Sequence, residues 1–461
     1  MQKFLSKYAV AAHLAILAVA PLFLFPFFGI EQTSSVLLWI SLFLLLWIFL
    51  EPSRRADEYL YQARKRICRS VVSDPLFWAF CLLLSVAFVR WMNDGVALEW
   101  GVVNKEWRWV VCSPGLSWLP GSDSLHGFVS FSVLAAAAVA VIACRHALGK
   151  SARTMFIFLS SLFAGIAAVV AISVSFSEAG FVNGTVSSGG AAHSFAGSGF
   201  GLFFLAAVTA FSGMYERGWN SAMILFSFAA GATFSGLWYF APPYVILFYS
   251  VSGAILLLVS IVYVAVNHGS QAFFKLLVAV IIAAAIPVVI IKFFAPVELI
   301  EAKSCMFSME FFESGYEESR KIYSAIASEV WQHGNVWLGG GLGSMPLFIK
   351  LELPENAWVD WIPNGWRQLL VERGIVGTVM VIIPFCFMIF TLIVRFFKSS
   401  LKRAFWPLAV LGVLTFLVAV AEGFFNASFF RPEMFVSVGA FFAIGVSSFP
   451  LRRNEADVKK R

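Results

Sequence analysis

The sequence predicts an all-α polytopic membrane protein with about twelve transmembrane helices and one large extramembrane loop that contains short helices. Of its 461 residues, 60% are hydrophobic and only 13% are charged, and the mean hydropathy is +0.84. The apolar residues form runs of roughly 17 to 25 residues, which are long enough to cross a bilayer as helices. A soluble protein of this composition would have too few polar residues to cover its surface. A large soluble α-helical domain is therefore excluded.

The apolar runs place the predicted spans along the whole chain. They lie near residues 8–30, 34–50, 74–92, 127–144, 155–175, 199–214, 221–239, 244–266, 274–294, 374–396, 405–423 and 433–449. With the N-terminus inside, every strongly basic loop between these spans falls on the cytoplasmic side, as the positive-inside rule requires. The same topology puts the C-terminus in the cytoplasm. Around Pro242 and Pro243 the two spans either stay separate or form one broken helix.

The formal net charge of +7 is concentrated at the ends of the predicted spans. Flanking lysine and arginine residues keep loops in the cytoplasm, and they also attract anionic lipid headgroups. The distribution therefore predicts contacts with membrane lipids and no nucleic-acid partner. The basic residues gather at Arg54, Arg55, Arg64, Lys65, Arg66 and Arg69, at Arg145, Lys150 and Arg153, at Arg395, Lys398, Lys402 and Arg403, and at residues 452–461.

This topology divides the chain into three parts. Residues 1–294 hold the first nine spans, residues 295–373 form the large outer loop, and residues 374–461 hold the last three spans and a basic cytoplasmic tail. A shorter outer segment, 93–126, is rich in tryptophan. Its tryptophans either form an aromatic belt at the headgroup level or stack on sugar rings. They are Trp100, Trp107, Trp109 and Trp118.

Within the large loop, apolar residues recur at helical spacing and predict an amphipathic helix over residues 315–332. Ser314 followed by Glu317 would form a capping box at its start. Arg320 lies in its first turns, at the flank of the packed face. A glycine-rich turn follows at residues 339–344. The apolar positions are Ile322, Tyr323, Ile326, Ala327, Val330 and Trp331.

Further along the loop, Pro363-Asn364 is followed by nine residues and then by Gly374-Ile375-Val376-Gly377. This spacing resembles that of the bacterial O-antigen ligase and O-antigen polymerase superfamily. There an outer loop ends in His-Asn, His-Ser or His-Gln, and after nine residues Gly-x-x-Gly enters a transmembrane helix. The order of the upstream features also resembles the family, because the helix with Arg320 precedes the glycine-rich turn. In this chain, Pro363 takes the place of the family histidine.

The resemblance implies a metal-independent glycosyltransferase that uses no cofactor. Such an enzyme moves a glycan from a polyprenyl diphosphate to a hydroxyl of an acceptor glycan or a lipid A-core-like glycolipid. The large loop is then periplasmic, and the reaction takes place at the outer face of the bacterial cytoplasmic membrane, in surface polysaccharide assembly. The chemistry requires cations against the leaving diphosphate and a group that takes the acceptor proton. Ligases, polymerases and protein O-oligosaccharyltransferases share this plan.

Arginine is the side chain that best fits a diphosphate, because its guanidinium matches phosphate oxygens in a bidentate fork and stays charged. Arg320 is the first candidate from its place in the family pattern, with a surface ion pair as the alternative role. Arg431 and Arg90 lie close to the hydrocarbon edge and are further candidates for substrate binding. For Arg90 the alternative is snorkelling to lipid headgroups. The arginine that the family carries before its sixth span is missing, since none lies between Arg153 and Arg217.

Proline can neither titrate nor donate a hydrogen bond, so another group must replace the histidine missing at Pro363. His333 and Asp360 are the candidate catalytic residues from the same loop, and Glu372 is a further substitute. His193, in the outer segment 176–198, is a candidate for substrate binding that could also act as the base. Each of these residues has the alternative of being a solvated loop residue.

Asn364 either hydrogen-bonds a sugar or caps the helix that follows it. Gly374 and Gly377 are spaced three residues apart, which predicts that another helix packs closely against them.

Two other functional classes fit the same sequence. A catalytically silent subunit of polysaccharide assembly or export would also tolerate the loss of the histidine at Pro363. A transporter of lipid-linked sugar would also have many spans, but it favours charges in the middle of helices. The predicted spans carry few ionisable residues away from their ends.

Overall fold

The computed structural model describes part of the chain. The described residues are 34–46, 65, 67–101, 106–111, 115–116, 118–148, 199–210, 220–241, 243–295, 316–333, 335–345, 364–398, 406–424, 438–439, 441–443 and 445.

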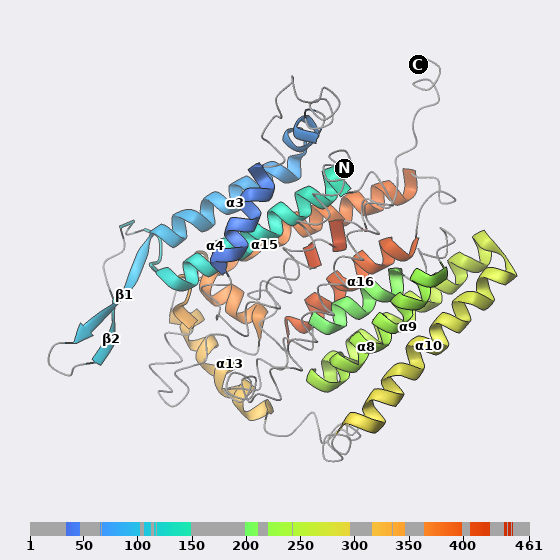
Figure 1. Cartoon of the computed structure of the whole chain (residues 1–461). Coiled ribbons are helices and arrows are strands. Elements are labelled where there is room, and N and C mark those ends of the chain that lie inside the picture. The colour runs from blue at the N-terminus through green and yellow to red at the C-terminus, as the bar shows by residue number, and fades with distance from the viewer. Residues whose placement is uncertain are drawn as a thin grey trace.

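The described residues are mostly helical (Figure 1). The elements in chain order are α3 (Pro75–Met92), β1 (Asp94–Gly101), β2 (Glu106–Val111), β3 (Ser122–Asp123), α4 (Ser124–Ala143), the π-helix η1 (Cys144–Leu148), α8 (Asn220–Phe240), α9 (Pro243–His268), α10 (Ser270–Phe294), α13 (Tyr316–His333), α15 (Gly365–Lys398) and α16 (Trp406–Glu422). Two further apolar helices cover Ser34–Leu46 and Gly199–Ala210.

Five helices are long and apolar enough to cross a membrane: α3, α4 with its π-helical end, α9, α10 and α15. Shorter apolar helices lie at four other predicted spans: Ser34–Leu46, Gly199–Ala210, Met223–Tyr239 within α8, and Trp406–Glu422. The predicted spans 8–30 and 155–175 lie outside the described residues, as does most of 433–449. The helical character is therefore confirmed, and the five long apolar helices agree with a membrane protein, while the number of about twelve spans and the large periplasmic loop stay predictions.

The chain forms two helices around Pro242, not one broken helix. Helix α8 ends at Phe240, and α9 begins at Pro243. Proline suits the first position of a helix, because its missing N–H would have no partner there and its φ is already helical.

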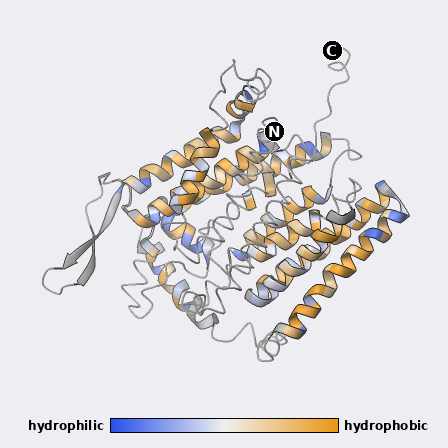
Figure 2. Ribbon diagram, in the orientation of Figure 1, coloured by the Kyte–Doolittle hydropathy of each residue, from blue (hydrophilic) through white to orange (hydrophobic). Residues whose placement is uncertain are grey.

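Helix α4 lies at the centre of the packing. Its stretch from Ala135 to Ala140 is buried throughout, and small side chains of this kind let neighbouring helices approach closely. Helix α3 packs along it (Figure 1). On another side of the molecule, α10 packs against α8 where Gly231 meets Ile286. The remaining surface of α10 is apolar and exposed, as expected of a helix that faces lipid, and Figure 2 shows hydrophilic residues at the turn between α9 and α10.

A small three-stranded sheet is the exception to the predicted all-α fold. Strands β1 and β2 form an antiparallel hairpin in which Trp100 stands opposite Trp107, and Leu98 opposite Trp109. The hairpin projects away from the helices (Figure 1). Strand β3 pairs with the start of β1 in parallel. The prediction missed these strands because the segment was assigned as a loop from its lack of a long apolar run.

Helix α13 confirms the predicted amphipathic helix almost to its bounds. Its apolar side packs on Met345 and on Val371 of α15, with Ala327 fully buried at the centre. Tyr323, Ile326, Val330 and Trp331 surround this contact. Ile322 differs from the prediction, because it remains 45% exposed at the edge of the stripe.

Helix α15 is broken at Gly374, whose φ of 67° and ψ of −175° are non-helical. The helix begins at Gly365, nine residues before the predicted span 374–396, so the last part of the predicted outer loop is helical. The break coincides with the predicted start of the span. The expected close approach at Gly374 is made by a loop and not by a helix: a Cβ there would lie 2.3 Å from the carbonyl oxygen of Trp337.

Candidate functional site

The glycine-rich turn is hydrogen-bonded to the break in α15. The N–H of Gly340 donates to the carbonyl of Val371 at 2.8 Å, and the N–H of Gly341 donates to that of Glu372 at 3.2 Å. In the other direction, the N–H of Ile375 donates to the carbonyl of Val336 at 3.1 Å. The break frees backbone groups of α15 that an unbroken helix would use internally, and the turn supplies their partners.

The same turn also holds the start of α4. The N–H of Asp123 donates to the carbonyl of Leu342 at 2.8 Å, and the N–H of Leu342 donates to Ser122 Oγ at 3.2 Å. Gly343 has a φ of 79° and lies so close that a Cβ would come within 2.9 Å of the Cβ and Cγ atoms of His126. Only glycine fits such a backbone and such a contact. Loop 335–345 therefore fixes α4 and α15 relative to each other.

Two arginines are buried where these elements meet. Arg90, near the end of α3, is 4% exposed and donates to the carbonyl oxygens of Glu372, at 3.2 Å, and Leu338. Arg373, at the break in α15, is 5% exposed and donates from Nη2 to Ser130 Oγ of α4. The two guanidinium groups repel each other, and Glu372 attracts both. Both guanidinium groups thus lie within electrostatic range of one buried carboxylate.

Glu372 is itself 2% exposed and lies among donors. Gln368 Nε2 donates to its Oε1 at 3.1 Å, and the backbone N–H of Gly343 faces the same carboxylate. His126 also interacts with it electrostatically. A carboxylate buried this deeply needs such partners, because an isolated one would cost many kcal/mol.

His126 completes the site together with Asp123. The Nδ1 atom of His126 is hydrogen-bonded to Asp123 Oδ2, and the same carboxylate accepts the backbone N–H of His126 at 3.3 Å as the N-cap of α4. We call Arg90, Asp123, His126, Glu372 and Arg373 the kink cluster. It combines two guanidinium groups, two carboxylates and one imidazole at one end of α3, α4 and α15.

Among the described residues, one donor of Arg373 has no hydrogen-bond partner. Arg373 Nε is buried and makes no hydrogen bond within the described residues. An unpaired buried donor costs about 1–3 kcal/mol, and such a cost is common where a site is prepared for a ligand. An oxygen-rich anion would satisfy this donor and reduce the repulsion between Arg373 and Arg90. The arrangement is chemically suited to a phosphate or diphosphate group.

No protein-family model and no curated protein matches this chain.

The structure describes some of the sequence-predicted site residues. Asp360, Arg431 and His193 lie outside the described residues, as does Pro363. Arg320 lies in the first turns of α13 as predicted, and His333 is the last residue of that helix. The side chains of Arg320 and His333 lie outside the described part of the structure.

The three remaining predicted residues, Asn364, Arg90 and Glu372, are described in full, and Glu372 lies buried on α15 and not in a solvated loop. Asn364 caps α15: its Oδ1 accepts the N–H of Arg367 at 3.0 Å, and its carbonyl accepts that of Gln368 at 3.1 Å. The capping alternative for Asn364 is thus observed. Arg90 does not reach outward as snorkelling would require, because its guanidinium is buried and bonded to two backbone carbonyls.

Asp123, His126 and Arg373 were not predicted from the sequence as site residues. Asp123 and His126 lie at the start of an apolar run, where they resemble an ordinary helix cap. Arg373 belongs to the nine-residue spacer of the motif, which has no fixed residue types. An arginine directly before a glycine at the mouth of a span was the one available signal.

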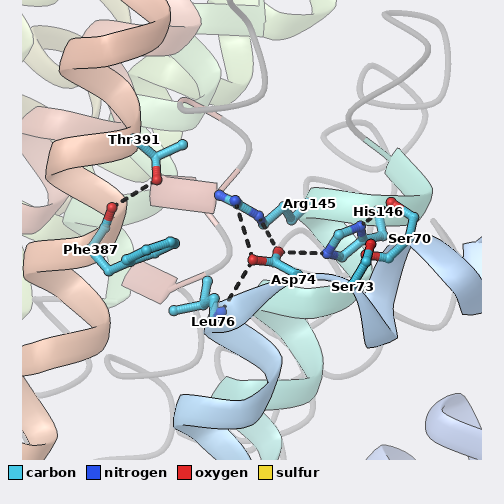
Figure 3. Close-up of polar contacts among 8 residues, drawn as sticks. All are labelled: Ser70, Ser73, Asp74, Leu76, Arg145, His146, Phe387 and Thr391. Carbon is cyan, nitrogen blue, oxygen red and sulfur yellow. Dashed lines mark hydrogen bonds and ion pairs between the residues drawn. The ribbon is translucent and has the colours of Figure 1, made fainter.

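A second polar cluster lies at the other end of α3 and α4 (Figure 3). Asp74 caps α3 by accepting the N–H of Leu76 at 3.1 Å, and it also accepts Arg145 Nε at 2.5 Å and His146 Nε2 at 2.8 Å. Ser70 Oγ meets His146 Nδ1 at 2.8 Å. On α3 the two clusters are separated by about 24 Å at 1.5 Å per residue, which is close to the thickness of the hydrocarbon layer.

Asp74 is ionised in this cluster. Burial raises the pKa of its carboxyl group, but the hydrogen bond from His146, the charge of Arg145 and the N–H of Leu76 outweigh burial and leave the pKa below its ordinary value of 3.8. The Arg145 guanidinium also lies over the ring of Phe387 in α15, 6.0 Å from its centroid. This cluster joins α3, η1 and α15 at the end that the charge pattern predicts to be cytoplasmic.

Proposed function

We propose that the protein is a metal-independent membrane glycosyltransferase of the O-antigen ligase type. It moves a glycan from a polyprenyl diphosphate to an acceptor hydroxyl at the periplasmic face of the bacterial cytoplasmic membrane. The acceptor is a glycan or a lipid A-core-like glycolipid, and the product enters surface polysaccharide assembly. Both termini lie in the cytoplasm.

The observation that carries the proposal is the unpaired buried Nε of Arg373 beside a second buried arginine, Arg90. A diphosphate that leaves the anomeric carbon gains negative charge, and fixed cations stabilise it most where water is excluded. The two arginines lie near the end of predicted spans, where the lipid tail of a polyprenyl donor can stay in the bilayer. Arg320 on α13 is the further cation that the family pattern supplies.

The motif spacing supports the same proposal. The glycine-rich turn and the segment from Asn364 to Gly377 are separate in the sequence, yet they are joined by the backbone hydrogen bonds of Gly340 and Gly341. The two segments that carry the family resemblance therefore lie next to each other in the structure.

The test uses the purified full-length protein in liposomes with a polyprenyl-diphosphate oligosaccharide and candidate acceptors, in the presence of a chelator. We expect transfer by the wild type. Arg373→Ala and Arg320→Ala should each nearly eliminate it, whereas Arg367→Ala should not. Arg367 is the matched control, because it lies on the same helical segment but is exposed and bonded to Ser324. Absence of product with every acceptor would contradict the proposal.

The second candidate is a catalytically silent subunit of polysaccharide assembly or export. It is favoured by the full engagement of Arg90 with backbone carbonyls and by Pro363 in place of the family histidine. A silent subunit would bind the lipid-linked glycan and form no product in the same assay. A lipid-linked sugar transporter would instead move the donor across the liposome membrane.

A further inference from the structure

The reaction needs a group that accepts a proton, and Pro363 cannot supply it. We propose that His126, oriented by Asp123, takes the proton from the acceptor hydroxyl. This inference rests on the proposed function, because it assigns a residue to that reaction.

The hydrogen bond between the two side chains defines the tautomer of His126. An ionised carboxylate can only accept, so Nδ1 of His126 donates its hydrogen to Asp123 Oδ2. In the neutral ring the basic lone pair then resides on Nε2. A carboxylate that orients an imidazole and stabilises its protonated form is the arrangement that general-base histidines commonly use.

The position of His126 places this base beside the cations. His126 and Ser130 lie four residues apart on α4 and therefore share one face of the helix. Arg373 reaches across to Ser130, and Glu372 interacts electrostatically with both His126 and Arg373. The base and the diphosphate-binding arginine thus face the same break in α15. Both groups must lie near one anomeric carbon during transfer, and the kink cluster brings them together.

The glycine-rich turn holds the imidazole in place. Gly343 packs against the Cβ and Cγ atoms of His126 with no room for a side chain, and the N–H of Asp123 is bonded to Leu342. The turn therefore fixes both members of the pair relative to Glu372 and Arg373. A motif that resembles the ligase family thus contacts the proposed base directly.

The acceptor O–H bond breaks and its proton moves to His126 Nε2, while the acceptor oxygen forms a bond to the anomeric carbon. The bond between that carbon and the diphosphate oxygen breaks, and its electron pair leaves with the polyprenyl diphosphate. Arg373 and Arg90 stabilise that charge. The imidazolium then returns its proton to water or to the departing diphosphate.

A purely structural role for the pair is testable, because Asp123 is also the N-cap of α4. Asparagine caps helices as well as aspartate does. Asp123→Asn therefore keeps the cap and removes the charge that stabilises the protonated ring. If Asp123 acts as a positioning residue, this variant lowers kcat and leaves the donor KM unchanged.

The experiment measures transfer, donor binding and melting temperature for His126→Ala, His126→Gln and Asp123→Asn. The control is His146→Ala, which removes the histidine of η1 that is bonded to Asp74. We expect His126→Ala and His126→Gln to lower kcat by about 100- to 10,000-fold with donor binding retained. Added imidazole should restore part of the activity of His126→Ala. His146→Ala should lower the melting temperature and keep the kcat of the folded fraction.

Three outcomes would overturn the inference. The first is an active wild type with both His126 variants within about threefold of its kcat, given that general-base loss costs at least about 100-fold; this leaves the proposed function intact. The second is an equal loss of kcat in the folded fraction of His146→Ala, which would indicate a general structural effect. The third is a wild type that binds the donor and forms no product, which overturns the proposed function as well.

Discussion

The backbone N–H of Gly340 donates to the carbonyl oxygen of Val371 at 2.8 Å. This bond joins the glycine-rich turn to the helix that leads into the break at Gly374. It lies beside the bond from Gly341 to Glu372, and Arg90 donates to the same Glu372 carbonyl. The geometry of the kink cluster therefore depends on backbone groups that the break in α15 leaves available.

Alanine substitutions at the two buried arginines should differ in their effects: Arg90→Ala should mainly lower stability, and Arg373→Ala should mainly lower activity. Arg90→Ala removes two hydrogen bonds from a charged donor to the backbone, each worth about 1.5–3 kcal/mol, and should lower the melting temperature in detergent clearly. Arg373→Ala removes a buried charge with an unpaired donor and should cost less stability, while it removes more activity per folded molecule. Thermal unfolding and transfer assays on both variants check this pattern. Equal stability losses, or a more active Arg373→Ala, would contradict the assignment.

Gly374→Ala should be much more destabilising than Gly269→Ala. Both glycines have backbone angles that only glycine adopts readily. Strain at these angles should therefore lower the stability of either alanine variant by about 1–3 kcal/mol. At Gly269 a Cβ meets nothing within 4 Å, whereas at Gly374 it meets the carbonyl oxygen of Trp337 at 2.3 Å. The difference between the two melting temperatures reports the close approach of loop 335–345 to Gly374. Equal shifts would show that this loop does not pack on Gly374.

Asp74→Asn should show the pH dependence of the second cluster. The folded-state pKa of Asp74 lies below its ordinary value of 3.8, so its ionised form stabilises the fold above that pH. We expect the variant to be less stable near neutral pH by as much as about 3 kcal/mol, since a buried ion pair loses its anion. The gap to wild type should narrow as the pH falls below 3.8 and Asp74 becomes protonated. Melting curves of both proteins at pH 6, 5, 4 and 3 measure this difference in stability. A difference that grows as the pH falls would contradict an ionised, stabilising Asp74.

The docking of α13 can be tested with two neighbouring alanines. Ala327 is 1% exposed and packs between Met345 and Val371, whereas Ala325 is exposed on the same helix. Ala327→Leu overpacks the contact and should cost about 1–3 kcal/mol, and Ala325→Leu should be nearly neutral. Limited proteolysis of the large loop and thermal unfolding distinguish them. Similar behaviour of both variants would show that α13 is not docked on α15.

The sequence predicted the elements whose signal is local and periodic. Apolar runs located α3, α4 and α10 because each span alone must satisfy its backbone in lipid, and the helical spacing of Ile326 and Val330 located α13. The hairpin was missed, since its pairing of Trp100 with Trp107 joins two short strands without a long pattern. The start of α15 was missed because polar residues precede the break at Gly374.

The site was less predictable than the fold, because it is made by contacts between distant segments. Arg90 was identified as a charge near the hydrocarbon edge, but its partners are backbone carbonyls that no residue type reveals. Arg373 and Ser130 meet only after α4 and α15 have packed. His126 was hidden by the capping role of Asp123, which by itself needs no functional explanation.

The most direct measurement is the affinity of the purified protein for polyprenyl diphosphate, compared among wild type, Arg373→Ala and Arg367→Ala. A charge-assisted hydrogen bond is worth about 1.5–3 kcal/mol, so Arg373→Ala should weaken binding by about 10- to 100-fold. Arg367→Ala, which changes an exposed arginine of the same helix, should bind like the wild type. An Arg373→Ala variant that binds polyprenyl diphosphate as tightly as the wild type would contradict the claim that the kink cluster holds the diphosphate.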